Sequence, residues 1–365
     1  MSAQRPAGGA DRGPSTRAVH AGLPPAQQGE PFLPGPVFAA PFHLAGDKDA
    51  APYGYHRYGN PTWSRYEEAL GELEGGEAVV FASGMAAVAA VLLPSLGAGD
   101  VLVAPSDAYP GVRTIATEHL APRGVEVRLV PTDEAAVRVA LPGATMVWIE
   151  TPSNPGLNVL DVTALADAAH DEGAALVVDN TLATPVLQQP LALGADLSVC
   201  SGSKHLSGHS DLILGHVAAR DPARLEALRG WRGLTGAIPG PFEVWLAHRS
   251  LATVALRLER QAAGAQALAR MLAARDDVTG VRYSGMGTVV CFELPDQTAA
   301  EGFLARLELV SEATSFGGVH SSAERRGRWG TDAVSDGFIR FSCGIEDTQD
   351  LLDDVARALD AAPRA

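Results

Sequence analysis

Cysteine is scarce in this sequence, and its scarcity excludes one way of stabilising a fold. The 365 residues contain three cysteines, Cys200, Cys291 and Cys343, which are odd in number and form no C-x-x-C pair. A disulfide framework is therefore not expected, and a reducing compartment suits the chain better. We predict that the three thiols are buried small hydrophobic groups.

Positive charge is also in short supply. Lys and Arg number 28 against 43 Asp and Glu, which gives a formal net charge of −15 at pH 7. Such a chain repels nucleic acid and anionic membrane surfaces, so neither is expected as a partner. No apolar run approaches the roughly 20 residues of a membrane span, and the first residues lack the apolar segment of a signal peptide. We expect a cytoplasmic protein.

What the sequence does contain is an ordinary globular composition, with 46% hydrophobic and 19% charged residues. The length favours one large domain and one smaller domain. Residues 1–14 are predicted to be disordered, and prolines scattered over 23–52 indicate an extended arm. We therefore predict an N-terminal arm over 1–57, a large domain over 58–253 and a smaller α/β domain over 254–365.

Helical and strand patterns alternate after Pro61. The predicted helices cover 63–76, 84–96, 162–173 and about 242–273, and the predicted strands cover 78–83, 100–105, 125–131, 145–150, 175–179 and 197–201. Apolar strands separated by helices indicate an α/β fold with a mostly parallel sheet and helices on both faces. Because ligands bind at the carboxyl ends of such strands, the polar residues that follow them are the candidate site.

One lysine follows a strand within a cluster of hydroxyl and glycine residues. The segment SVCSGSKHLSGHSD, residues 198–211, places Ser201 and Ser203 beside Lys204. A lysine in a loop is most often a solvated surface charge. Here the hydroxyls offer donors to an anion, and the amine is placed to form a Schiff base with an aldehyde.

Two further segments suit a cofactor that carries both an aldehyde and an anionic group. Asp179 ends the apolar strand ALVVD, where a carboxylate needs a cationic partner such as a pyridinium nitrogen, although a turn or helix cap is the alternative. Ser83, Gly84 and Met85 follow a strand and open a helix whose free N–H groups suit a phosphate, although close helix–strand packing explains the glycine equally well. Lysine, carboxylate and phosphate site together indicate pyridoxal 5′-phosphate.

The sequence also resembles a known family over residues 16 to the C-terminus. The matching segments, in order, are YHRYGNPT, LEGGEAVVFASGMAA, ETPSNP, VVDNTLATPVLQQPLALGAD, SGSKHLSGHSD and GFIRFSCGIED. They are similar to those of the Cys/Met-metabolism family of pyridoxal-phosphate enzymes, which includes cystathionine γ-lyase, cystathionine γ-synthase, cystathionine β-lyase and methionine γ-lyase. The resemblance implies the aspartate-aminotransferase-type fold, fold type I, which agrees with the α/β interpretation.

The resemblance implies roles for residues around the cofactor. Lys204 would form the imine with it and transfer protons, Asp179 would pair with the pyridine nitrogen with support from Thr181, and Tyr109 would stack on the ring and assist proton transfer. The other implied cofactor contacts are Ser83, Gly84, Met85, Ser201 and Ser203 at the phosphate and Asn154 at the 3′ oxygen.

The resemblance also implies contacts to the substrate and to a second subunit. Arg340 would bind the substrate α-carboxylate, a task that suits a guanidinium, and Ser315 would assist it. Tyr55 and Arg57, from the arm, would reach the phosphate of the neighbouring subunit, so that the site is shared across a dimer and the enzyme is a homotetramer.

The reaction is the least determined part of the interpretation. We predict α,γ-elimination of L-cystathionine to L-cysteine, 2-oxobutyrate and ammonia, with a γ-replacement enzyme as the alternative and a methionine γ-lyase or cystathionine β-lyase behind it. Thr314 stands where cystathionine-handling members usually carry a glutamate, and Arg113 lies one residue short of a substrate-binding arginine of those enzymes. The segment between Ser315 and Arg340 is shorter than usual and lacks its Thr-His motif, which leaves elimination, replacement and substrate open.

A metal site is not expected. His205, His209 and His216 lie close together in sequence, but no ligand geometry is implied by their spacing and the family needs no metal.

Overall fold

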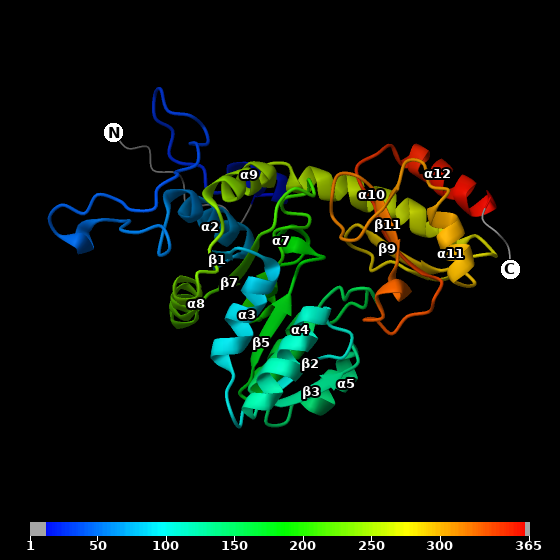
Figure 1. The fold of residues 1–365 in the computed structure, drawn as a ribbon, viewed down its shortest axis with the longest axis horizontal. Coiled ribbons are helices and arrows are strands. Elements are labelled where there is room, and N and C mark those ends of the chain that lie inside the picture. Colours follow the sequence, from blue (N-terminus) through cyan, green and yellow to red (C-terminus); the bar gives the residue numbers. More distant parts are fainter. Residues whose placement is uncertain (1–11, 362–365) are drawn as a thin grey trace.

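The computed structural model describes residues 12–361, so the predicted disorder of residues 1–11 lies outside the described part. The end of that prediction is wrong, because Pro14 already begins helix α1 (Pro14–His20). From there to Pro52 the arm contains one short 3₁₀ helix, η1 (Lys48–Ala50), and otherwise extended or irregular chain (Figure 1). A proline-rich segment cannot complete a backbone hydrogen-bond ladder, which accounts for this form.

Two sheets organise the described chain. The larger has the strand order β1 (Glu77–Phe81), β7 (Gly215–Ala219), β6 (Leu197–Cys200), β5 (Ala175–Asp179), β4 (Met146–Glu150), β2 (Val101–Pro105) and β3 (Glu126–Val130). The smaller has the order β10 (Ser311–Glu312), β11 (Ser322–Arg325), β12 (Phe338–Ser342), β9 (Val289–Glu293) and β8 (Thr279–Arg282). The two sheets lie side by side, with helix α10 (Val254–Ala273) running from one to the other (Figure 1).

The prediction of an α/β fold with a mostly parallel sheet is confirmed. Strands β3, β2, β4, β5 and β6 are parallel, whereas β7 is antiparallel to both of its neighbours, β6 and β1. Strand β7 was not predicted, because its sequence GHVAA is short and contains glycine and histidine. The division of the chain into an arm and two domains at residues 57 and 253 stays a prediction.

Helices cover both faces of the larger sheet. One face carries α3 (Gly84–Ser95), α4 (Pro110–Thr114) and α8 (Pro222–Thr235), and the other carries α2 (Pro61–Glu74), α5 (Glu134–Ala140), α6 (Val162–Asp171) and α9 (Pro241–Leu251). The short α7 (Thr184–Leu187) follows β5, and α10 (Val254–Ala273), α11 (Gln297–Leu304) and α12 (Thr348–Ala361) pack on the smaller sheet.

The predicted helix over 242–273 is in fact two helices. It breaks at Ala252 and Thr253, where the N–H of Thr253 bonds to the carbonyl of Ser250 instead of continuing the α-helical ladder. The side chain of Arg257 stabilises the break, since its guanidinium donates to the carbonyls of Ser250, His205 and Leu206. The hydrophobic pattern continues across the break, which is why periodicity alone merged the two helices.

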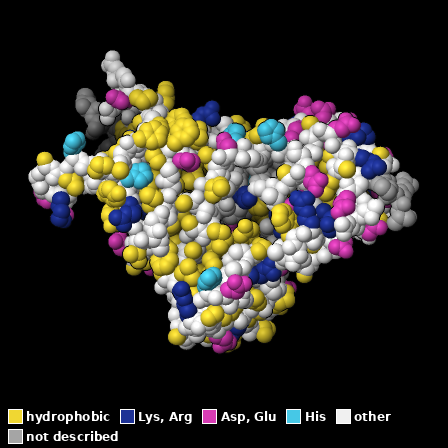
Figure 2. All heavy atoms as spheres, viewed as in Figure 1, with side chains coloured by type: hydrophobic (Ala, Val, Ile, Leu, Met, Phe, Trp, Pro, Cys, Tyr) yellow, Lys and Arg dark blue, Asp and Glu magenta, His cyan; other side chains and the backbone are white. Residues whose placement is uncertain are grey.

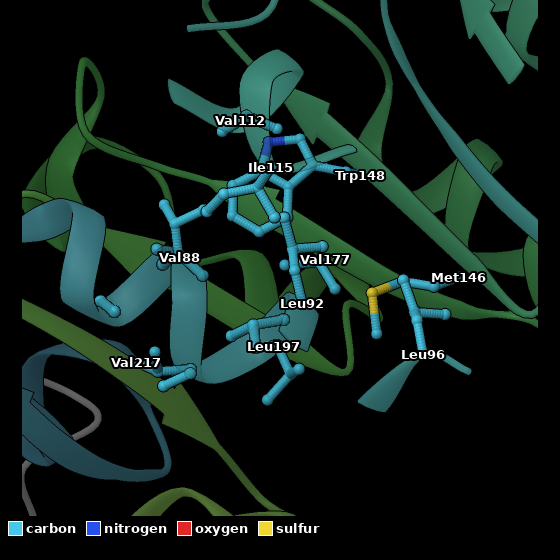
Figure 3. Close-up of a cluster of buried hydrophobic side chains, with 14 of the residues drawn as sticks. Val88, Leu92, Leu96, Val112, Ile115, Met146, Trp148, Val177, Leu197 and Val217 are labelled. Carbon is cyan, nitrogen blue, oxygen red and sulfur yellow. The ribbon is translucent and has the colours of Figure 1, made fainter. Parts of the chain in front are cut away.

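The main core lies between the sheet and the helices α3, α4 and α8 (Figure 3). Trp148 on β4 is fully buried there, and Val88 and Leu92 of α3 pack in the same cluster. Burying each such side chain contributes about 1.5–3 kcal/mol, so this cluster fixes α3 against the carboxyl ends of the strands. The predicted burial of Cys200, Cys291 and Cys343 is confirmed, and all three are free thiols.

The surface differs between the two ends of the molecule. On the face shown in Figure 2, hydrophobic side chains gather on the side of the larger sheet and the arm, whereas charged side chains crowd the C-terminal part. Phe32 and Phe38 of the arm are 90% and 72% exposed. Within residues 12–361 we find no helix with the length and apolar character that crossing a bilayer requires.

Candidate active site

A cavity of about 780 Å³ lies between the parts of the chain that carry the two sheets. Its size is that of a site for a small molecule or cofactor. One wall is formed by the carboxyl ends of β4, β5 and β6 with the start of α3, and the other by the segment before β11 and by β11 and β12. The predicted site residues that line it are Ser83, Gly84, Met85, Tyr109, Asn154, Asp179, Thr181, Ser201, Ser203, Lys204, Ser315 and Arg340.

Lys204 follows β6 in a tight turn and points its amine into this cavity. Its Nζ donates to the Oγ of Ser315 at 2.5 Å and lies 5.1 Å from the ring centre of Phe316. Burial, with a further contribution from the positive charge of Arg340, lowers the pKa of Lys204 to about 8. A lysine with a lowered pKa has more free amine at neutral pH, which is what imine formation requires.

Asp179 ends β5 on the same wall. Its Oδ1 accepts the N–H of Thr181 at 3.0 Å, and burial raises the pKa of Asp179 above its usual value. Within residues 12–361 no Lys or Arg pairs with it. A partly buried carboxylate in this situation is suited to a cation such as a protonated pyridine nitrogen.

The start of α3 forms the candidate phosphate site. Ser83 caps the helix by accepting the N–H of Ala86 at 3.0 Å, and the preceding two N–H groups at the helix start have no intrahelical partner. A Cβ on Gly84 would lie 3.0 Å from the side chain of Ser201, so this close approach favours glycine. The hydroxyl of Ser203 is already used, since it donates to the carbonyl of Leu214 and accepts the N–H of that residue.

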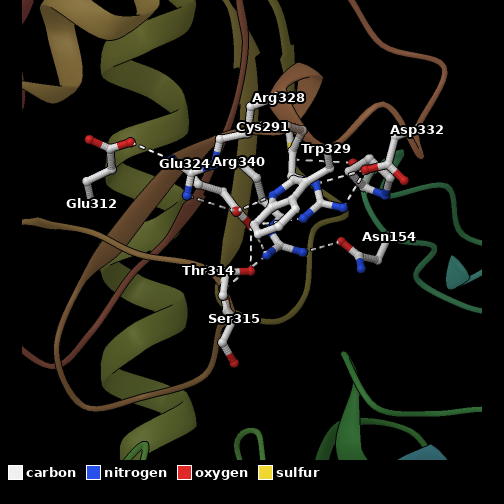
Figure 4. Close-up of polar contacts among 12 residues, drawn as sticks. Asn154, Cys291, Glu312, Thr314, Ser315, Glu324, Arg328, Trp329, Asp332 and Arg340 are labelled. Atoms are coloured by element: carbon white, nitrogen blue, oxygen red, sulfur yellow. Dashed lines mark hydrogen bonds and ion pairs between the residues drawn. The ribbon is translucent and has the colours of Figure 1, made fainter. Parts of the chain in front are cut away.

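The opposite wall contains Arg340, which is almost fully buried on β12 (Figure 4). Its Nη1 donates to the Oδ1 of Asn154 at 2.7 Å, and its Nη2 donates to the carbonyl of Ser315 at 3.2 Å and to the carboxylate of Glu324. Burial lowers the pKa of Arg340, while Glu324 opposes that shift. Asn154, predicted to contact the cofactor, therefore also orients the guanidinium.

Glu324 is a member of this site that the sequence did not reveal. It lies on β11 directly opposite Arg340 in the β11–β12 pairing, and Trp329 donates its indole N–H to it at 2.9 Å. Thr314 reaches the same carboxylate at 3.3 Å. Burial by itself would raise the pKa of Glu324, but Arg340, Trp329 and Arg326 together hold it below its usual range.

Arg326 is a second member of this site that the sequence did not reveal. It lines the cavity, donates to Glu324 at 3.0 Å and pairs with Asp332 through its Nε at 2.8 Å. Both residues belong to the segment that departs from the usual family pattern, so no motif marked them. The sign that the sequence offered was that this segment differs from the usual family pattern.

Tyr55, Arg57 and Arg113 do not line the cavity of this chain. Tyr55 is 46% exposed on the arm, and Arg57 lies over its ring and donates to the carbonyl of Gly233 at 3.2 Å. Arg113 donates to the carbonyls of Ala108 at 2.9 Å and of Thr331. The predicted contacts of these three residues with phosphate or substrate stay predictions.

The histidines near Lys204 have ordinary partners. His205 hydrogen bonds with the hydroxyl of Thr288 at 2.7 Å, His209 with the carbonyl of Ser207 at 2.6 Å, and buried His216 with Glu74 at 2.8 Å. Across residues 12–361, no three His, Cys, Asp or Glu side chains are grouped so that they could hold a metal ion.

The donor set fits pyridoxal phosphate. Lys204 supplies an amine of lowered pKa, Asp179 a partly buried carboxylate without an ion pair among the described residues, and the start of α3 a set of N–H groups beside Ser201. These three features lie on one wall of one cavity, and Tyr109 lines the same wall.

Comparison with known proteins points the same way. The family model described as Cys/Met metabolism PLP-dependent enzyme matches residues 15–360. A protein of Streptomyces coelicolor named "Putative cystathionine gamma-lyase" is 53% identical over 369 residues, covering 95% of this chain and 94% of that protein. The cystathionine gamma-synthase of Mycobacterium tuberculosis is 35% identical over 378 residues, covering 95% and 97%.

A solved structure from Micromonospora echinospora is similar in fold as well. That protein, CalE6, is described as a methionine gamma lyase for one structure and as a cystathione gamma lyase for another. The first structure has a TM-score of 0.89 and 38% identity, covering 95% of this chain and 98% of that chain. Proteins named for three different activities thus match most of the length of this chain. With the family model spanning nearly the whole chain and the cavity holding the groups that the cofactor needs, the chain belongs to the Cys/Met-metabolism family of PLP-dependent enzymes.

Proposed function

We propose that this enzyme eliminates the γ substituent of L-cystathionine and releases L-cysteine, 2-oxobutyrate and ammonia. The observation that carries the proposal is the arrangement of Lys204 and Arg340 on opposite walls of one cavity, both bound to Ser315. An amino-acid substrate held by its α-carboxylate at Arg340 would have its Cα near the amine of Lys204. The name of the Streptomyces coelicolor relative supports the same choice.

Residues of one wall would transfer protons, and residues of the other wall would bind the substrate carboxylate. When bound, the cofactor supplies an electron sink that makes the Cα proton of an amino acid acidic. Lys204 would carry that proton and a second one from Cβ, because its amine is uncharged in a larger fraction of molecules than a solvated lysine. Arg340 would bind the carboxylate, and Asn154 and Glu324 would hold the guanidinium in place.

A second candidate is elimination from methionine. Thr314 stands where cystathionine-handling members usually carry a glutamate, and its hydroxyl is bound to Glu324. Glu324 itself is buried and surrounded by Arg340, Arg326 and Trp329, so it offers no free carboxylate to the distal ammonium of cystathionine. The similarity to CalE6 supports this candidate and the first one equally, because that protein is described both as a methionine gamma lyase and as a cystathione gamma lyase.

A γ-replacement reaction is the third candidate, supported by the similarity to the cystathionine gamma-synthase. The test for all three is to incubate the purified, cofactor-loaded enzyme with cystathionine, with methionine, and with O-acetylhomoserine plus cysteine. 2-Oxobutyrate with cysteine from the first supports the proposal. 2-Oxobutyrate with a volatile thiol from the second, or a thioether from the third, would replace it.

We also infer that Tyr55 and Arg57 complete the site of a second copy of the chain, in a cytoplasmic homotetramer built from such dimers. Both residues lie outside the cavity of their own chain, and the arm that carries them exposes Phe32 and Phe38. Buried contact with another copy would cover these rings.

Mixing two inactive variants tests the shared site. Arg57→Ala and Lys204→Ala each damage one half of a site, so mixed dimers regain one intact site. Recovery of partial activity after the two are unfolded and refolded together supports the proposal. No recovery, with dimers confirmed by light scattering, contradicts it.

A further inference from the structure

Glu150 is a buried carboxylic acid in the cavity for which the proposed function has no role. It ends β4 and is the register partner of Asp179, which ends the parallel neighbour β5. Register partners on adjacent strands point to the same face of a sheet and lie about 5 Å apart. Both carboxyl groups line the cavity, so they form a pair on the wall that holds Lys204.

Glu150 also holds the residue predicted to stack on the cofactor. Its Oε1 accepts the backbone N–H of Tyr109 at 2.6 Å. The side chain of Tyr109 is 47% exposed, so packing alone does not fix it. Because Glu150 is 5% exposed, its bond to Tyr109 is shielded from competing water.

We propose that Glu150 is a positioning residue that fixes Tyr109 at the cavity and leaves the negative charge of the carboxyl pair on Asp179. The proposal rests on the proposed function, because the charge of Asp179 matters only opposite a pyridine nitrogen. It assigns to Glu150 no contact with the substrate.

The surroundings of Glu150 favour its uncharged form. Burial raises the pKa of Glu150 well above its usual value, and the carboxylates of Asp179 and Asp107 raise it further. The N–H of Tyr109 and the charge of Arg113 oppose this, but the pKa of Glu150 stays well above its usual value. Two adjacent carboxyls, one buried and one partly buried, cannot both ionise at low cost, so one of them keeps a proton.

The surroundings of Asp179 favour the charged form more strongly. Burial raises the pKa of Asp179 too, but the hydroxyl and the N–H of Thr181 and the side chain of His216 lower it. Asp179 accepts the N–H of Thr181, and the Thr181 hydroxyl also lowers the pKa of Asp179, whereas the one hydrogen bond shown to Glu150 comes from Tyr109. The shared proton is therefore expected on Glu150.

Three variants separate the two parts of the proposal. Glu150→Gln keeps the acceptor for Tyr109 and is uncharged at every pH. Glu150→Ala and Glu150→Leu both remove the acceptor, and Leu keeps most of the side-chain volume. Glu134→Gln, on the exposed surface of α5, is the matched control. The measurements are the dissociation constant of pyridoxal phosphate from tryptophan fluorescence of the apo-protein, and the pH midpoint of the visible band of the loaded protein.

We expect Glu150→Gln to match the wild type in both measurements. Glu150→Ala and Glu150→Leu are expected to raise the dissociation constant about tenfold, because the hydrogen bond that holds Tyr109 is lost. They should leave the pH midpoint unchanged, because no charge is removed. A lower kcat with little change in KM should accompany the weaker cofactor binding.

Two outcomes would overturn the proposal. A shift of the pH midpoint by about one unit in Glu150→Gln would show that Glu150 is ionised. Wild-type cofactor binding in a folded Glu150→Leu would show that the bond to Tyr109 is unimportant. If the alanine and leucine variants fail to fold, the Glu150→Gln midpoint still decides the charge. Failure of the wild type to bind the cofactor would instead refute the proposed function.

Discussion

The two walls of the cavity treat their charges in opposite ways. On the wall built from the larger sheet, Lys204, Asp179 and Glu150 are buried or partly buried without ion pairs among the described residues, and their pKa values shift toward the uncharged forms. On the wall built from the smaller sheet, Arg340 and Glu324 form an ion pair and Glu324 has a pKa below its usual range.

The charged groups of the first wall thus lack ion-pair partners within residues 12–361, whereas those of the second wall already have them. Unpaired buried groups are costly, so the first wall gains free energy when a cofactor supplies an aldehyde, a phosphate and a ring nitrogen. The paired arginine of the second wall is held in one orientation before the substrate arrives, which reduces the ordering cost of binding. Ser315 joins the two, since its hydroxyl contacts Lys204 and its carbonyl contacts Arg340.

Removal of the amine from the first wall is expected to have the largest effect. Lys204→Ala should lower turnover by about 10³-fold, because proton transfer at Cα loses its base. Borohydride reduction of the loaded protein should attach the cofactor to Lys204 in the wild type and not in this variant. Lys48 is the one other lysine in the sequence and is exposed, so Lys48→Ala is the control. Labelling at Lys48 in place of Lys204 would contradict the assignment.

A change at the second wall should have a smaller effect. Arg340→Lys keeps a positive charge but loses the fork that contacts Asn154, Ser315 and Glu324 together. We expect kcat/KM to fall by about 10²-fold, mainly through KM, in steady-state assays. Arg282→Lys, at an exposed pair with Glu293, should behave like the wild type. An unchanged KM in Arg340→Lys would exclude the carboxylate role.

The lowered pKa of Lys204 predicts a pH dependence of cofactor capture. The free amine is the reactive form, so the rate must rise with pH through the pKa of about 8. We expect the colour of the apo-protein mixed with pyridoxal phosphate to develop roughly tenfold faster at pH 9 than at pH 7, and to level off above pH 9. A rate that keeps rising toward pH 10.5 would indicate a solvated lysine.

Substitution of Ser315, which contacts both walls, should have the smallest effect on activity. Ser315→Ala removes the hydroxyl bound to Lys204 but leaves the backbone carbonyl bound to Arg340. We expect kcat to fall about fivefold with KM nearly unchanged, measured against exposed Ser335→Ala. A loss as large as that of Lys204→Ala would mean that Ser315 transfers protons itself.

Much of the first wall could be predicted from the sequence because its groups follow their strands at once. Asp179 ends β5, Gly84 opens α3 after β1, and Lys204 lies four residues after the end of β6. Parallel strands bring their carboxyl ends to one edge of a sheet, so the strand pattern alone was enough to gather these residues. The resemblance to the family added Arg340 and Ser315, which no local pattern marked.

The second wall could not be predicted in the same way. Glu324 and Arg340 lie sixteen residues apart and meet through the register of β11 and β12, and a shift of one residue would point either side chain to the other face. Asn154 meets Arg340 across 186 residues, and therefore only when the two sheets face each other. The break between α9 and α10 could not be predicted either. It is stabilised by a hydrogen bond from the side chain of Arg257 to the carbonyl of Ser250, and the hydrophobic pattern of the sequence carries no sign of that bond.

The sequence by itself determined the fold class, the cofactor and the position of the lysine that we propose to be reactive, because local strand ends and short motifs encode them. The tertiary structure decided which charges are paired before a ligand binds, that Glu150 stands beside Asp179, and that Tyr55 and Arg57 lie outside the cavity of their own chain. These depend on burial and on register between distant strands, and burial and register are properties of the packed molecule.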